Sequence, residues 1–222
     1  GPKNTFCLLG HVEEAFCGGL HTDPMLDYKI SNAKWPYDSV GHTSNGKFGG
    51  SATLVGTTKD KTVGLVVSCA HIWDEGGQRG FFWWEGVEGK WEGKILIMDF
   101  ERDLSLWAIK NPPNIKTPLC VTKAKPADGP FVAVGFPSYG NGRQHYNKGN
   151  FISYDRNGYE VYVNMDVHSG YSGGALFNKY GQYCGIVCGN TVLGRNGQPD
   201  NHGSWESRHT SGDYLISTVG KF

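Results

Sequence analysis

The most informative stretch of this 222-residue chain is Gly170-Tyr171-Ser172-Gly173-Gly174-Ala175-Leu176-Phe177-Asn178. A serine hydroxyl becomes an effective nucleophile only when a neighbouring base takes its proton. Glycines beside Ser172 permit a tight turn in which backbone N–H groups converge on one point and bind an oxyanion. We expect the N–H groups of Gly170 and Ser172 to be those donors. Taken alone, the stretch also fits an ordinary hairpin turn.

Two further segments contain the groups that such a serine needs. The run Val66-Val67-Ser68-Cys69-Ala70-His71 ends a β-branched segment in a histidine. We therefore expect His71 at the rim of a strand, facing Ser172 as its base. Asp103 opens the alternating segment Leu104–Ile109. It is expected to accept the Nδ1–H of the histidine, which fixes the tautomer of the ring.

Each of these signals is weak by itself, because a lone histidine or aspartate is more often structural. Asp99 and Glu101 are also near enough to compete with Asp103. Together the signals are stronger, since His71, Asp103 and Ser172 follow one another in an order that recurs in the Ser-His-Asp triad.

Residues 48–219 resemble the trypsin-like peptidases. Val66–His71 is similar to the family's strand that ends in Ala-His. Asp103–Leu106 is similar to its Asp-[Ile/Leu]-Ala-Leu segment, and Gly170–Gly174 to its Gly-x-Ser-Gly-Gly turn. Val132–Pro137 is similar to the segment that opens the second barrel in the disulfide-poor HtrA-like members. The resemblance implies a serine endopeptidase that acts on polypeptides through an acyl-enzyme and needs no cofactor.

The rest of the sequence predicts an all-β fold. Glycine occurs 33 times and aromatic residues make up 13%, which suits short strands, many turns and a bulky core. Two sets of about six short strands favour two packed antiparallel six-stranded β-barrels, the chymotrypsin-like double barrel. The predicted strands are Ser51–Gly56, Thr62–Ser68, Gly80–Trp84, Lys94–Met98, Leu104–Ile109, Pro130–Phe136, Gly149–Tyr154, Tyr159–Met165, Ala175–Asn178, Tyr183–Cys188 and Tyr214–Thr218.

Three parts of the chain follow from this pattern. Residues 1–45 lack clear alternation and are predicted to be an irregular N-terminal arm. Residues 46–113 are predicted to form the first barrel, with the histidine and the aspartate. Residues 114–222 are predicted to form the second barrel, with the serine and the substrate pocket. The junction is expected at Asn111-Pro112-Pro113-Asn114.

Composition excludes several kinds of partner. The 21 basic and 21 acidic side chains balance, so we expect no nucleic-acid partner. No apolar run approaches the length of a membrane span. The six cysteines, Cys7, Cys17, Cys69, Cys120, Cys184 and Cys188, match no secreted disulfide scaffold. We favour free buried thiols, and with them a reducing intracellular compartment over secretion.

A small repeat near the N-terminus is a weak metal candidate. Cys7, His11, Cys17 and His21 recur with a period of ten residues and contain the donor types of a tetrahedral zinc site. The loop is tight and the spacing is not a common zinc pattern. We therefore favour no metal there, with free thiols or a Cys7–Cys17 disulfide as the preferred interpretations.

The chain departs from the secreted trypsins at two positions. Ile72 follows His71, where those enzymes have a cysteine, and Tyr171 precedes Ser172, where activated zymogens have an aspartate that pairs with a new N-terminus. The resemblance therefore implies an enzyme competent without that cleavage. Disulfide-poor bacterial and viral proteases, including viral polyprotein-processing ones, are the members that this pattern suits.

The resemblance also suggests a substrate pocket. Asp166 stands six residues before Ser172, the offset at which trypsin-like members pair a pocket aspartate with Lys or Arg of the substrate. Gly189 and Gly212 resemble wall positions that keep such a pocket open. Against this, His168 lies between the aspartate and the serine. Two alternatives therefore stay open: Asp166 turns outward, or it pairs with His168.

The strand after the serine is expected to line the same pocket through Val187 and Cys188. Proteases that prefer glutamine or acidic side chains often have a histidine on this strand. Because Val187 stands at that position, the sequence argues against such a preference.

Two other functions compete with a peptidase. Gly170-x-Ser172-x-Gly174 fits the nucleophile elbow of a serine esterase with an α/β-hydrolase fold, with His202 or His209 as the base. The strand–helix alternation of that fold is missing from the sequence. A non-catalytic protease-like binding module is the other alternative, and the presence of all three triad residue types argues against it.

We predict that His42, His145, His202 and His209 are surface groups.

Overall fold

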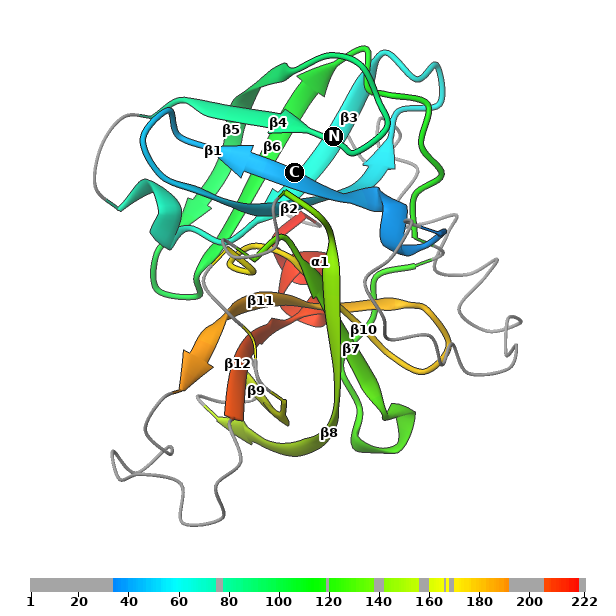
Figure 1. Ribbon diagram of the computed structural model, residues 1–222, viewed down its shortest axis with the longest axis vertical. Helices are drawn as coiled ribbons and strands as arrows, with labels where there is room; N and C mark the ends of the chain where they lie inside the picture. Colours follow the sequence, from blue (N-terminus) through cyan, green and yellow to red (C-terminus); the bar gives the residue numbers. More distant parts are fainter. Residues whose placement is uncertain are drawn as a thin grey trace.

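Two stacked β-barrels make up the molecule, as Figure 1 shows. The computed structural model describes residues 34–74, 78–118, 120–137, 142–155, 160–165, 167, 170–191 and 206–219. Within these residues each barrel is closed and contains six strands that pair antiparallel. The predicted all-β double barrel is therefore confirmed.

The first barrel contains strands β1 to β6. Their bounds are β1 Val40–Ser44, β2 Gly49–Thr57, β3 Val63–Ser68, β4 Gly80–Trp83, β5 Trp91–Asp99 and β6 Leu104–Lys110. The strand order is β1-β2-β3-β6-β5-β4, and the pairing of β1 with β4 closes the barrel. β1 lies within the range predicted as an irregular arm, so that prediction was wrong for residues 40–44. The Val-Gly-His-Thr-Ser sequence of β1 is too short and polar to stand out.

The second barrel contains strands β7 to β12. Their bounds are β7 Phe131–Gly135, β8 His145–Asp155, β9 Glu160–Asn164, β10 Ala175–Phe177, β11 Tyr183–Thr191 and β12 Glu206–Ser211. The strand order is β10-β11-β12-β9-β8-β7, closed by the pairing of β10 with β7. This antiparallel topology excludes the α/β-hydrolase fold on which the esterase alternative depended.

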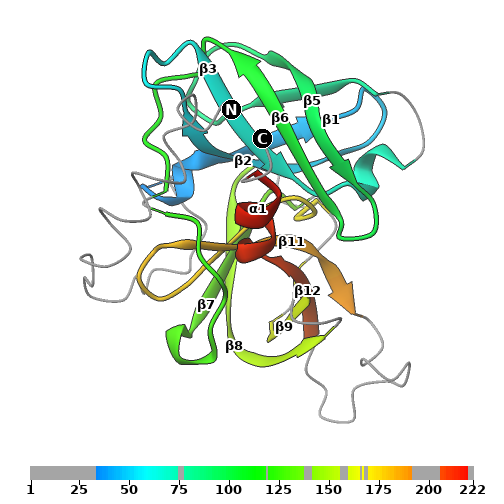
Figure 2. The ribbon, with the colours of Figure 1, turned by 180° about the vertical axis from the view of Figure 1, so that it is seen from behind.

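A helix replaces the predicted final strand. α1 spans Gly212–Val219, whereas the sequence predicted a strand over Tyr214–Thr218. Leu215 is fully buried and Ile216 packs against the core, so adjacent apolar residues both face inward, as a helix permits. Both ribbon views place α1 between the two barrels (Figure 2). No helix among the described residues is long and apolar enough to cross a membrane.

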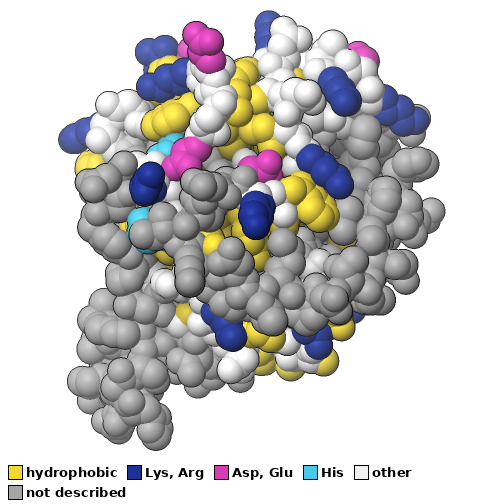
Figure 3. Space-filling model, turned by 45° about the vertical axis from the view of Figure 1, so that its right-hand side comes forward, with side chains coloured by type: hydrophobic (Ala, Val, Ile, Leu, Met, Phe, Trp, Pro, Cys, Tyr) yellow, Lys and Arg dark blue, Asp and Glu magenta, His cyan; other side chains and the backbone are white. Residues whose placement is uncertain are grey.

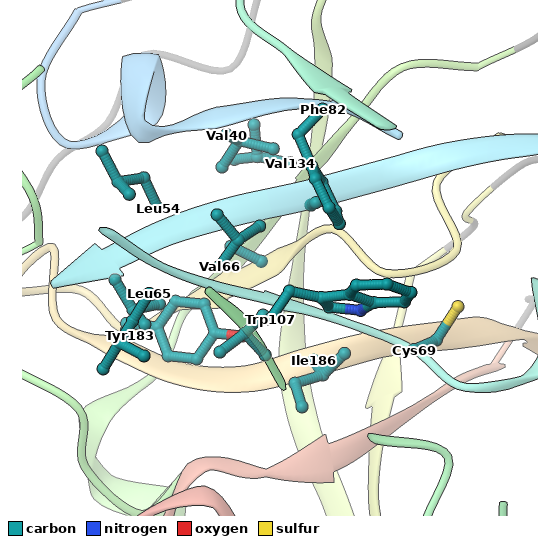
Figure 4. Packing of buried hydrophobic residues seen from close by; sticks show 14 of the residues in the cluster. Val40, Leu54, Leu65, Val66, Cys69, Phe82, Trp107, Val134, Tyr183 and Ile186 are labelled. Atoms are coloured by element: carbon teal, nitrogen blue, oxygen red, sulfur yellow. The ribbon is translucent and has the colours of Figure 1, made fainter. Parts of the chain in front are cut away.

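The apolar core is continuous from one barrel to the other. Trp107 on β6 packs with Phe82 and Trp73 at ring-centroid distances of 5.4 and 4.7 Å. Val134 and Tyr183 of the second barrel belong to the same buried cluster (Figure 4). The relative position of the barrels is therefore fixed by shared packing.

The described cysteines are of two kinds, three free thiols and one disulfide-bonded residue. Cys69, Cys184 and Cys188 are buried free thiols, as expected. Cys120 is disulfide-bonded, so the expectation of a free thiol was wrong for that residue. The preference for a reducing compartment stays a prediction.

Removal of the Trp107 side chain tests how much the core contributes to stability. Because the indole is fully buried and its Nε1–H donates to Ser105 Oγ at 2.9 Å, we expect Trp107→Ala to lower the free energy of unfolding by about 3–5 kcal/mol. Phe100→Ala, at a side chain that is 50% exposed, is the control, with an expected change within about 0.5 kcal/mol. Urea unfolding measures both, and equal effects would contradict the packing described.

Candidate active site

His71, Asp103 and Ser172 come together where the two barrels meet. His71 Nε2 lies 2.9 Å from Ser172 Oγ, and His71 Nδ1 lies 2.7 Å from Asp103 Oδ2. The His71 side chain is 45% exposed and that of Asp103 12%. The contacts span both barrels, because His71 follows β3, Asp103 precedes β6 and Ser172 precedes β10.

Strand pairing explains why the histidine and the aspartate meet. Ser68, the last residue of β3, pairs with Ser105 near the start of β6. The residue that leaves β3 and the residue that enters β6 therefore lie at the same rim of the first barrel. Asp103 makes this approach with a φ of 54°, in the left-handed region that aspartate tolerates better than most residues.

Hydrogen bonds hold the Asp103 carboxylate in one orientation. Oδ1 accepts the backbone N–H groups of Ala70 at 2.8 Å and His71 at 2.9 Å, which leaves Oδ2 for the imidazole. Burial by itself would raise the pKa of Asp103. The hydrogen bonds and charge of His71, with the N–H of Ala70, outweigh it and hold the pKa of Asp103 below its usual value. Asp103 is thus ionised at neutral pH, while Asp99 instead binds Arg102 at 3.0 Å.

The turn around Ser172 leaves no room for a side chain at Gly173. Gly173 has a φ of 86°, and a Cβ added there would lie 2.1 Å from Ser68 Oγ. Its N–H donates to the carbonyl of Val187 at 2.8 Å, which ties the turn to β11. The sequence identified this turn by its glycines, and the structure shows the contact that requires one of them.

Ser51 of β2 ties the same turn to the first barrel. Its N–H donates to the Ser172 carbonyl at 2.8 Å. Its hydroxyl donates to the Gly170 carbonyl at 2.7 Å and accepts the Phe136 N–H at 3.0 Å. Sequence reasoning missed Ser51, since a serine in a strand carries no signal of such a role.

Two cavities flank the three-residue group and share only His71 and Asp74. One has a volume of about 420 Å³ and the other about 330 Å³. The larger is lined by His71, Asp74, Phe100, Glu101, Arg102, Asp103, Cys188, Gly189, Arg208 and Thr210. The smaller is lined by Phe48, Gly49, His71, Ile72, Asp74, Gly170 and Ser172. Phe100 lines the larger cavity and Phe48 the smaller one, and both are large apolar side chains exposed to solvent.

Only some of the residues predicted to form the substrate pocket line one of these cavities. Cys188 and Gly189 line the larger cavity, and the Cys188 carbonyl lies 3.3 Å from Ser172 Oγ. Val187 is fully buried behind the serine turn. Gly212 begins α1 instead, where an added Cβ would lie 2.3 Å from the Thr122 carbonyl, so it packs between backbones and does not line either cavity.

Several predicted residues lie outside the described part of the chain. They are Asp166, His168, His202 and the weak metal candidates Cys7, His11, Cys17 and His21.

Two histidines predicted at the surface are wholly or partly enclosed. His42 packs between Trp83 and Phe136, and burial lowers its pKa to about 4. His209 on β12 is fully buried, its Nε2 lies 2.7 Å from Ser207 Oγ, and burial lowers its pKa to about 3. Because the sequence of β12 is polar, it carries no signal that His209 lies inside the barrel. Charges of both signs lie on the face in Figure 3, in keeping with the balanced composition.

Comparisons with known proteins show which family the chain belongs to. The model of the trypsin-like peptidase domain matches residues 50–186. The chain therefore belongs to the trypsin-like peptidase family, as the resemblance implied.

Solved structures share the fold at low identity. The serine endoprotease from Yersinia pestis aligns with a TM-score of 0.60 and 19% identity, over 83% of this chain and 62% of that one. The present chain thus spans less than two thirds of that protein. The Rv3671c protease in its inactive form aligns with a TM-score of 0.59 and 18% identity, over 83% of this chain and 89% of that one. The search of curated proteins gave no match.

Burial of His209 predicts acid sensitivity of the fold. An unfolded histidine protonates near pH 6.5, whereas folded His209 does so near pH 3, so the unfolded state binds more protons between these values. The free energy of unfolding should then fall on acidification, by up to about 1.4 kcal/mol per pH unit. We expect His209→Gln to remove this part of the slope in urea unfolding. The control is His145→Gln, and an unchanged slope in His209→Gln would contradict the assignment.

Proposed function

We propose that this chain is a serine endopeptidase in which Ser172 is the nucleophile, His71 the base and Asp103 the group that orients the base. The observation that carries the proposal is the pair of contacts made by one imidazole, 2.9 Å to the serine oxygen and 2.7 Å to the carboxylate. Because the ionised Asp103 binds the Nδ1–H, Nε2 is the nitrogen left free to accept the serine proton.

The reaction follows from this arrangement. As Ser172 Oγ attacks the scissile carbonyl, its proton passes to Nε2 of His71, and Asp103 stabilises the imidazolium. The N–H groups of Gly170 and Ser172 are the donors that we propose for the oxyanion. His71 then gives the proton to the leaving amine. Water, deprotonated by the same nitrogen, releases the acyl group and restores the serine.

One feature favours cleavage within a chain over trimming of chain ends, and another favours an enzyme that needs no activating cleavage. The cavities on either side of His71 allow a polypeptide to extend in both directions from the scissile bond. The contact of His71 with Ser172 also exists without a zymogen-type ion pair, since Tyr171 is buried at the position of the zymogen aspartate.

Replacement of the nucleophile tests the reaction. We expect Ser172→Ala to lower kcat for peptide hydrolysis by about 10⁴-fold or more, because no other group can form the acyl-enzyme. A fluorophosphonate should label the native chain and leave Ser172→Ala unlabelled. The matched control is Ser51→Thr, which keeps a hydroxyl at the turn and should still be labelled. A native chain that is folded and unlabelled would favour the non-catalytic binding module.

The finer specificity that we propose is cleavage after Lys or Arg, in a viral polyprotein-processing role. It is supported by the offset of Asp166 from Ser172 and by the disulfide-poor, zymogen-free sequence type. Peptides that differ only at the residue before the scissile bond measure it. We expect kcat/KM for Arg to exceed that for Phe and Glu by about 100-fold, and Asp166→Asn to abolish the difference. Equal rates for the three peptides would contradict the specificity while leaving the mechanism intact.

A further inference from the structure

Two buried cysteines lie near the candidate active site, and the proposed reaction uses neither thiol. Cys69 is fully buried, two residues before His71. One ligand atom from each of Cys69, His71 and Asp103 lies within 4.8 Å of the other two. Cys188 of β11 lines the same cavity as His71 and Asp103, and its Sγ lies 3.2 Å from Thr210 Oγ1. A thiol, an imidazole and a carboxylate thus lie close together, and a second cysteine lines the cavity beside them.

This donor set suits zinc better than the harder divalent cations. Zn²⁺ prefers sulfur and imidazole ligands with a carboxylate, in tetrahedral geometry. Its bonds of about 2.0–2.3 Å place neighbouring ligand atoms roughly 3.3–3.7 Å apart. The ligand atoms of Cys69, His71 and Asp103 lie between 2.7 Å, for His71 and Asp103, and the 4.8 Å limit, so shifts of about an ångström would bring these three to the distances that zinc requires.

We propose that Cys69, His71 and Asp103, with Cys188 as the fourth ligand, form an inhibitory Zn²⁺ site inside the candidate active site. This regulation rests on the proposed peptidase function, whereas the metal binding does not. The larger cavity is the entry path, because His71, Asp103 and Cys188 all line it. Cys69 does not line this cavity and belongs to the buried apolar cluster (Figure 4).

Inhibition follows from what the ion would displace. Zn²⁺ bound to the imidazole and the carboxylate replaces the 2.7 Å hydrogen bond that orients His71. The ring can then no longer accept the proton of Ser172 in the required geometry. The thiol protons go to solvent on binding.

The first experiment measures peptide hydrolysis in buffers of set free Zn²⁺ concentration. We expect inhibition that EDTA reverses, and a half-inhibiting concentration at least about tenfold higher in Cys69→Ala. Cys184→Ala is the matched control, because Cys184 is an equally buried free thiol on β11 that is absent from the cluster. Inhibition of Cys69→Ala at the native concentration would show that exposed His71 alone binds the ion, and would overturn the proposal. So would native activity that Zn²⁺ leaves unchanged.

A second experiment detects the metal without activity. Co²⁺ added to the Ser172→Ala protein should give a thiolate-to-cobalt charge-transfer band. Adding Cys69→Ala to that protein should remove the band, or the part of it that belongs to this site. A spectrum that Cys69→Ala leaves unchanged would overturn the proposal. If the native chain proves inactive towards peptides, the proposed function fails while the cobalt spectrum still decides on the metal site.

Discussion

The turn around Ser172 depends on hydrogen bonds from both barrels at once. Ser51 of the first barrel binds the carbonyls on either side of Tyr171, and Val187 of the second binds the N–H of Gly173. A side chain at Gly173 would collide with Ser68 and Ser51, so the turn fits only between barrels that are already packed. The distance between serine and histidine therefore reports the packing of the whole molecule rather than a local loop conformation.

Asp103 is the second such constraint, and it is electrostatic. A largely buried carboxylate is unfavourable unless hydrogen bonds compensate for lost solvation. Here two backbone N–H groups and the imidazole provide them, at 2.7–2.9 Å. The same interactions fix the tautomer of His71, so the stability of the ionised carboxylate and the orientation of the base have a common origin.

Much of this architecture could be predicted from the sequence, for identifiable reasons. Short apolar segments between glycines predicted the double barrel, and the order His71, Asp103, Ser172 predicted which side chains meet. The polar strand β12 and its buried His209 could not be predicted, because Glu206–Ser211 has no apolar alternation. Tyr214–Thr218 contains apolar residues but too few to distinguish a short helix from a strand. The two cavities depend on loops that are distant in sequence, and only the folded chain brings them together.

The Ser51 hydroxyl has one further consequence. It has a single hydrogen, which goes to the Gly170 carbonyl, while its oxygen accepts the Phe136 N–H. Rotation of the Gly170–Tyr171 peptide would break the first bond and leave a buried donor unsatisfied, at a cost of about 1–3 kcal/mol. Ser51, which is 119 positions away in the sequence, thus restrains the peptide next to the proposed oxyanion donors. Because a strand of the first barrel holds this peptide, control of such a site would come from what occupies it rather than from its ordering.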